Sequence, residues 1–140
     1  MLITETPIEV RYPDCDPMGI VHHAVYVVWY EIARMDFFKK MGFSYTDMNA
    51  LGINPPMVDL HVQYFSTAKY PQDLTVRTSI KSYAKNKIEL QYETWAEGGE
   101  KPINTAVTFH IWTGPDMRAY NMEEKLPEVY AKIKAAAGDN

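Results

Sequence analysis

Tyr12-Pro13-Asp14-Cys15-Asp16-Pro17-Met18-Gly19-Ile20-Val21-His22-His23 runs directly into the most apolar helical pattern of the chain, residues 24–41. The stretch combines two carboxylates, a thiol, two histidines and a turn that contains proline and glycine. The pattern that follows is apolar on nearly every side, and such a helix is expected to be surrounded by other protein. We therefore expect the polar stretch to lie in a sheltered place, beside free backbone N–H groups and the positive end of the helix dipole. That combination is typical of an active site.

The composition excludes several classes of protein. The chain has 140 residues and a formal net charge of −4. This length predicts a single domain, residues 1–140, with a core of its own. The charge argues against general nucleic-acid binding, and no apolar run is long enough to span a bilayer. The single cysteine excludes an intrachain disulfide, and the first residues lack the features of a signal peptide, so we expect a cytoplasmic protein.

The remaining periodicity predicts a sheet. Residues 3–12 alternate at their end, as a half-buried strand does, and the helix is expected to begin near residues 21–23 and to end at Gly42. Ser44 could cap a short second helix, and Pro127 could start a last one. Four further segments with a period of two are separated by short turns: 58–64, 74–80, 88–93 and 103–111. This order predicts an α+β domain in which a five-stranded antiparallel sheet curls around one long central helix.

The loop and helix resemble a known family. Residues 14–26, followed by Trp29-Tyr30-Glu31 and Ala33-Arg34, resemble the hot-dog-fold acyl-CoA thioesterases, namely the 4-hydroxybenzoyl-CoA thioesterase family and its Tol-Pal-associated branch. The resemblance implies the hot-dog fold and a homodimer whose sheets join edge to edge, often paired into a tetramer. It also implies active sites between subunits, no cofactor, and a catalytic aspartate at Asp16 with His23 at the start of the helix.

Hydrolysis of an acyl-CoA thioester, which releases a carboxylic acid and coenzyme A, fits these residues. Asp16 could attack the carbonyl carbon or activate a water molecule, and the sequence leaves both open. The backbone N–H groups near His23 could stabilise the oxyanion, and the His23 side chain could orient Asp16, the water or the thioester. Two alternatives stay open: a hydratase or dehydratase that acts on acyl thioesters, and a non-catalytic acyl-thioester-binding protein.

Other residues are candidates for binding the substrate. Lys85, Asn86 and Lys87 crowd one turn and could hold the phosphates of coenzyme A, although an ordinary solvated hairpin explains them equally well. Apolar residues could line an acyl pocket or belong to the core. The predicted substrate-binding set is Gly19, Tyr26, Met57, Val58, Lys85, Asn86 and Lys87, with Met57 and Val58 reaching the site across the subunit interface.

Three rival interpretations concern the same stretch. Cys15 could be a nucleophile, but the carboxylates on either side would raise the pKa of its thiol. A metal site is disfavoured because adjacent histidines on a helix point about 100° apart. Glu31 could be a second catalytic carboxylate, it could pair with Arg34 at the i, i+3 spacing, or these two charges could have a partner across the subunit interface.

Overall fold

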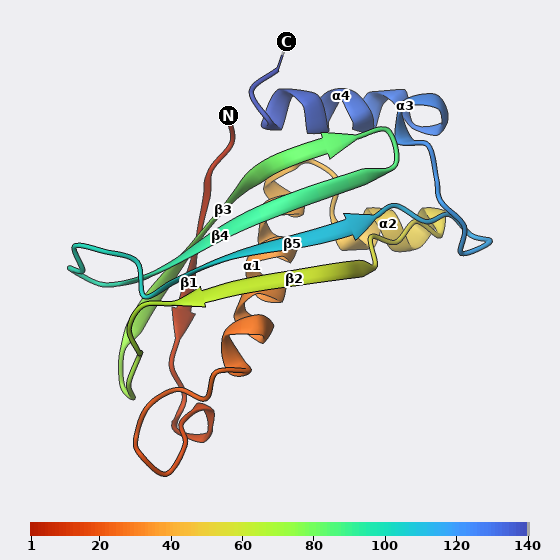
Figure 1. Cartoon of the computed structure of the whole chain (residues 1–140). Helices are drawn as coiled ribbons and strands as arrows, with labels where there is room; N and C mark the ends of the chain where they lie inside the picture. Colours follow the sequence, from red (N-terminus) through yellow and green to blue (C-terminus); the bar gives the residue numbers. More distant parts are fainter. Residues whose placement is uncertain (140) are drawn as a thin grey trace.

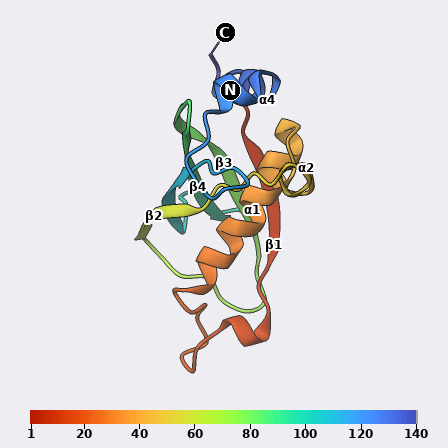
Figure 2. The same cartoon turned by 90° about the vertical axis from the view of Figure 1, so that its right-hand side faces the viewer.

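A long helix packed on one face of an antiparallel sheet forms the body of the protein. The computed structural model describes residues 1–139 and shows the predicted hot-dog arrangement, in which helix α1 (Val25–Met41) crosses the sheet (Figures 1 and 2). The strands occur in the spatial order β1-β3-β4-β5-β2, and each pair is antiparallel. Their bounds are β1 (Thr4–Glu9), β2 (Met57–Tyr64), β3 (Asp73–Ala84), β4 (Lys87–Ala96) and β5 (Asn104–Ile111).

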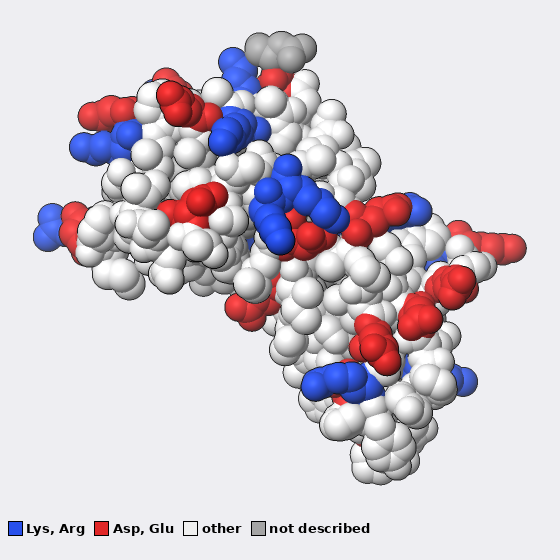
Figure 3. All heavy atoms as spheres, turned by 180° about the vertical axis from the view of Figure 1, so that it is seen from behind, with Lys and Arg blue, Asp and Glu red and all other residues white. Residues whose placement is uncertain are grey.

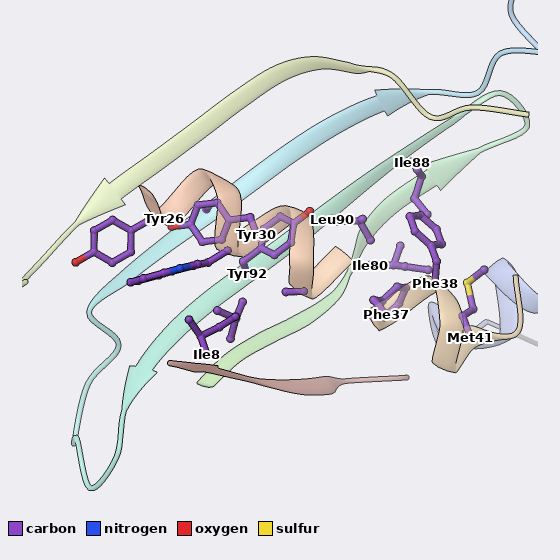
Figure 4. Packing of buried hydrophobic residues seen from close by; sticks show 14 of the residues in the cluster. Ile8, Tyr26, Tyr30, Phe37, Phe38, Met41, Ile80, Ile88, Leu90 and Tyr92 are labelled. Atoms are coloured by element: carbon purple, nitrogen blue, oxygen red, sulfur yellow. The ribbon is translucent and has the colours of Figure 1, made fainter. Parts of the chain in front are cut away.

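The register of the strands selects which side chains meet the helix. Thr78 of β3 lies opposite Tyr92 of β4, and alternate residues on either side of this pair point toward α1. Leu90 and Tyr92 pack there against the aromatic face of the helix, which includes Tyr30 and Phe37 (Figure 4). The segments that form β3 and β4 therefore have the half-buried pattern that the sequence predicts. Strand β5 also alternates, but most of the residues that it buries are polar, namely Asn104, Thr108 and His110.

One pairing differs from the simple reading of the turns. Strands β2 and β3 follow each other in the chain but are not neighbours, because β2 pairs with β5 at one edge of the sheet. Every residue of β2 is exposed except the half-buried Val62. An edge strand of this length, with unpaired backbone groups, is a template for another strand.

Helix α1 differs from the prediction in two respects. It begins at Val25 rather than near residues 21–23, and it ends as expected at Gly42, which has a φ of +101°. It is also not enclosed on all sides within one chain. Val28 is 56% exposed, and Ile32 and Met35 are also exposed along the same side of the helix.

Shorter helices lie near the C-terminal end of α1. Helix α2 (Tyr45–Leu51) begins at the predicted cap, where the Ser44 hydroxyl accepts a hydrogen bond from the Asp47 N–H. Helix α4 (Pro127–Ala136) starts at its predicted proline, and α3 (Met122–Lys125), a single turn before it, was not predicted.

The outer surface is mixed in charge. On the face opposite to that of Figure 1, acidic and basic residues lie side by side in small groups among uncharged ones (Figure 3). Within residues 1–139, no helix has both the length and the apolar character needed to cross a membrane.

Candidate active site

The two carboxylates of the opening stretch have different surroundings. Asp14 is buried, and its carboxylate accepts hydrogen bonds from the backbone N–H of Arg11 at 2.9 Å and from its guanidinium Nη2 at 2.9 Å. The Asp14 backbone carbonyl also accepts from the N–H of His22 at 2.9 Å. These contacts give Asp14 a turn-stabilising role. The interaction with Asp14 in turn raises the pKa of the exposed Arg11 guanidinium.

Asp16 is the half-buried carboxylate that begins the next turn. Its backbone carbonyl accepts from the N–H of Gly19 at 2.9 Å, and one carboxylate oxygen accepts from the N–H of Met18 at 2.8 Å. Pro17 follows the aspartate, and Gly19 has a φ of +80°, as this kind of turn requires. A Cβ on Gly19 would meet no atom within 4 Å, so only the backbone conformation demands glycine there. Among the described residues, no group donates to the other carboxylate oxygen of Asp16, so this oxygen is free for chemistry.

The histidines precede the helix rather than belong to it. The Ala24 N–H donates to Nδ1 of His22 at 3.1 Å, and the Val25 N–H donates to the His22 carbonyl at 3.0 Å. Both histidines are exposed, and their rings stack at 4.3 Å. Among the described residues, no protein acceptor takes the N–H of His23. A free N–H at a helix start is the kind of donor that an oxyanion needs.

Two tyrosines anchor this helix start to the sheet. Tyr64, the last residue of β2, donates its hydroxyl hydrogen to the His23 carbonyl at 2.7 Å. Tyr26 is buried, and its hydroxyl accepts from the N–H of Ala68 at 3.0 Å, so it belongs to the wall behind the loop. Burial raises the pKa of both hydroxyls, which keeps them protonated at neutral pH. The contact of Tyr64 could not be predicted from the sequence, because no local pattern shows which loop the end of a strand will meet.

The other predicted binding residues lie elsewhere in the chain. The loop that contains Asp16 and the turn that contains Lys85 lie at opposite ends of the molecule (Figures 1 and 2). In that turn the Lys85 and Asn86 carbonyls accept from the N–H groups of Met122 and Trp112, and the Lys87 ammonium lies 5.8 Å from the centre of the Phe109 ring.

Met57 and Val58 are exposed at the start of β2, whereas Tyr64, which contacts the loop, is at its end. Within a single chain, the predicted substrate-binding residues Met57, Val58 and 85–87 therefore do not lie beside the Asp16 loop. The loop is correspondingly less sheltered than expected, since Pro17, Met18 and Gly19 are all exposed.

The rival interpretations fare differently. Cys15 is half-buried and free, and a backbone bridge between Cys15 and Val21 closes the loop. Within residues 1–139, no group of three or more His, Cys, Asp or Glu side chains is placed to hold a metal ion. The predicted ion pair between Glu31 and Arg34 is wrong: Glu31 is exposed, and Arg34 binds tyrosine hydroxyls instead.

A buried polar network, also missed from the sequence, runs from the helix to the start of β2. The Arg34 Nη1 donates to the Tyr92 hydroxyl at 3.1 Å, and this hydroxyl lies 2.7 Å from that of Thr108. The Thr108 hydroxyl lies 2.8 Å from Nε2 of His110, whose Nδ1 lies 2.8 Å from the Pro55 carbonyl. Burial lowers the pKa of His110 to about 4, so the ring is neutral at pH 7. Because the Pro55 carbonyl can only accept, Nδ1 of His110 carries the proton and Nε2 accepts from Thr108. Every hydrogen bond of this network then runs in the direction from Arg34 toward Pro55.

Comparison with known proteins agrees with this architecture. The family model described as the thioesterase-like superfamily matches residues 10–136. The Bacillus subtilis protein YneP, described as a candidate acyl-CoA thioesterase, is 38% identical over 111 residues, which is 79% of this chain and 80% of YneP. The acyl-CoA thioester hydrolase YbgC of Escherichia coli is 33% identical over 54% of this chain and 57% of its own.

A solved structure extends the likeness to the whole chain. The crystal structure of the DHNA-CoA thioesterase from Staphylococcus aureus has a TM-score of 0.87 and 35% sequence identity, and the alignment covers 96% of this chain and 93% of that one. Because the family model matches residues 10–136, nearly the full length of this chain, the chain belongs to the thioesterase-like superfamily.

Proposed function

We propose that the protein is an acyl-CoA thioesterase in which Asp16 acts as nucleophile or general base. One observation carries the assignment of the residue: the turn leaves an oxygen of Asp16 free in the same closed loop that leads to the unpaired N–H of His23. The buried alternative, Asp14, has both of its carboxylate oxygens bound by Arg11. The activity itself fits relatives that are described as acyl-CoA thioesterases.

Hydrolysis of the thioester needs an attack on the carbonyl carbon and the departure of coenzyme A. Either the free Asp16 oxygen attacks the thioester carbonyl carbon and a water later hydrolyses the anhydride, or Asp16 takes a proton from a water that attacks directly. In both routes negative charge develops on the carbonyl oxygen, and the His23 N–H with the helix dipole would stabilise it. The carbon–sulfur bond breaks and coenzyme A leaves as the thiolate, which takes a proton from the protonated Asp16 in the general-base route or from water in the nucleophilic route. The acyl group becomes a carboxylic acid. The exposed His23 imidazole is available to orient the carboxylate or the water.

We propose further that two copies of the chain complete the site by pairing their β2 strands. In an antiparallel pair of identical edge strands, the start of one strand lies beside the end of the other. The end of β2 is bonded to His23 through Tyr64, so the partner subunit's Met57 and the partner subunit's Val58 would come beside that histidine. The exposure of β2 and its open edge support this pairing.

The two-fold rotation that relates the paired β2 strands would also bring the remaining substrate-binding candidates to the site. It carries the end of the partner that holds the partner's Lys85, the partner's Asn86 and the partner's Lys87 toward the Asp16 loop, where these residues would bind the phosphates of coenzyme A. The exposed apolar side of α1 (Val28, Ile32 and Met35) offers a surface for a second contact that would pair dimers into a tetramer. A cytoplasmic enzyme fits a chain whose one cysteine is free.

Release of free thiol from a panel of aromatic, short and medium-chain acyl-CoAs tests the proposed activity. We expect wild type to hydrolyse at least one class and Asp16→Asn to lose about two or more orders of magnitude in kcat, because the amide neither attacks nor takes a proton. Asp14→Asn is the matched control, and it should lower stability more than turnover. Turnover unchanged in a folded Asp16→Asn variant would refute the role of Asp16. Hydration of an enoyl-CoA without thiol release would favour a hydratase, and saturable binding without turnover would favour a binding protein.

A further inference from the structure

A buried positive charge without an opposing charge lies in the middle of α1. Arg34 is 7% exposed, and its Nε and Nη1 atoms donate to the hydroxyls of Tyr45 at 3.0 Å and Tyr92 at 3.1 Å. Among residues 1–139, no carboxylate forms an ion pair with it. Guanidinium groups keep their charge in proteins, and a buried charge that has only neutral partners is rare unless it binds something.

The guanidinium borders a hollow that is open to ligands. The hollow has a volume of about 480 Å³, and it lies between α1, α2 and the segment before β2. Its polar wall comes from Arg34, Tyr45, Asn49 and Asn54. The third nitrogen of the guanidinium, Nη2, donates to no protein group among the described residues, so it remains available to a ligand in this hollow.

The groups around the hollow leave the positive charge largely uncompensated. On the core side, Tyr92 and Thr108 lead to the neutral His110, so the network behind Arg34 carries no negative charge. On the solvent side Glu31 lines the hollow but is exposed and does not pair with Arg34. Water screens an exposed carboxylate, whereas the buried guanidinium is screened much less.

We propose that this hollow is a subsite for a carboxylate carried by the acyl group, at the end remote from the thioester. Nη2 of Arg34 would donate to the carboxylate, and the amides of Asn49 and Asn54 are the further donors in the wall. The placement rests on the proposed function, because the hollow adjoins Pro55 and Pro56, and β2 pairing would bring this segment of one subunit beside the Asp16 loop of the other. The preferred substrates are then acyl-CoAs derived from small dicarboxylic acids.

Direct binding tests the subsite without requiring hydrolysis. In nitrogen-15 NMR spectra of the wild-type protein, the Arg34 Nε–H resonance, assigned as the one missing from Arg34→Lys, should shift saturably on titration with glutarate. It should not shift with pentanamide, which has a similar length and no charge. Glu31→Gln should change glutarate binding by less than about twofold, because water screens the exposed carboxylate that it removes. An unmoved resonance overturns the proposal, and so does saturation by phosphate but not by glutarate.

Kinetics give the second, separate test. For wild type we expect a higher kcat/KM for glutaryl-CoA than for pentanoyl-CoA, whose acyl groups have chains of equal length. Arg34→Gln should lower the ratio of the kcat/KM for glutaryl-CoA to that for pentanoyl-CoA about tenfold or more, as loss of a charged hydrogen bond does. Equal ratios in wild type and Arg34→Gln overturn the subsite even if hydrolysis is efficient. If Arg34→Gln does not fold, the wild-type titration decides alone, and a saturable glutarate shift in a protein without thioesterase activity would refute only the proposed function.

Discussion

The neutral buried histidine makes the stability of this protein depend on pH in a defined direction. His110 is 1% exposed, and burial lowers its pKa from 6.5 to about 4. Between these values the unfolded chain binds a proton that the folded chain does not bind, so the free energy of unfolding falls as the pH falls from above 6.5 toward 4. The difference corresponds to about 3 kcal/mol, at about 1.4 kcal/mol for each pH unit.

Urea unfolding at fixed protein concentration, at several pH values between 7.5 and 4.5, measures this dependence. The matched variant is His110→Asn, which keeps a polar side chain but does not titrate. We expect the stability of wild type to fall by about 2.5 kcal/mol more than that of the variant over this range. The three exposed histidines, His22, His23 and His61, are common to both proteins and cancel in the difference. Equal slopes in the two proteins would refute the neutral, hydrogen-bonded state assigned to His110.

Three further predictions concern the turn, the edge strand and the lysines. Gly19→Ala should cost about 1 kcal/mol of stability in urea unfolding and also reduce thiol release. The control is Gly98→Ala, at a similar φ of +74°, which should cost as much stability and leave turnover intact. Equal turnover in the two variants would show that the conformation of the Asp16 turn does not matter for catalysis. Leu60→Lys should sediment as a monomer, since lysine on an edge strand opposes pairing, and an unchanged dimer would contradict the β2 interface. Lys85→Glu combined with Lys87→Glu should raise KM for acyl-CoA and weaken inhibition by free coenzyme A, and unchanged values would make this turn an ordinary hairpin.

The sequence predicted the elements well because their signals are local. Alternating residues marked each strand, Ser44 marked the cap of α2, and Gly42 marked the end of α1. Pairing is different, because it depends on which strands meet after the chain folds. Nothing in the residues between Tyr64 and Asp73 shows that β2 pairs with β5 rather than with the strand that follows it.

The candidate site was predictable only in part, for the same reason. The loop with Asp14 and Asp16 stood out because its turn residues and its place before a helix are local features. The Arg34 network was not predictable, since Tyr92, Thr108 and His110 come from strands far along the chain. The spacing of Glu31 and Arg34 suggested a pair, but the guanidinium binds the hydroxyls of Tyr45 and Tyr92 instead, because Glu31 faces solvent.

A mixed dimer tests most directly whether Asp16 of one subunit works with the other subunit. Asp16→Asn removes the carboxylate, and Val58→Trp should block the acyl pocket; each homodimer should be inactive and still dimeric. Two different affinity tags would isolate the dimer that contains one chain of each kind. With a shared site, one of its two sites has both defects and the other has neither, so we predict about half of the wild-type thiol release. No thiol release from this mixed dimer would mean that Asp16 and Val58 act within one chain, and it would contradict the account.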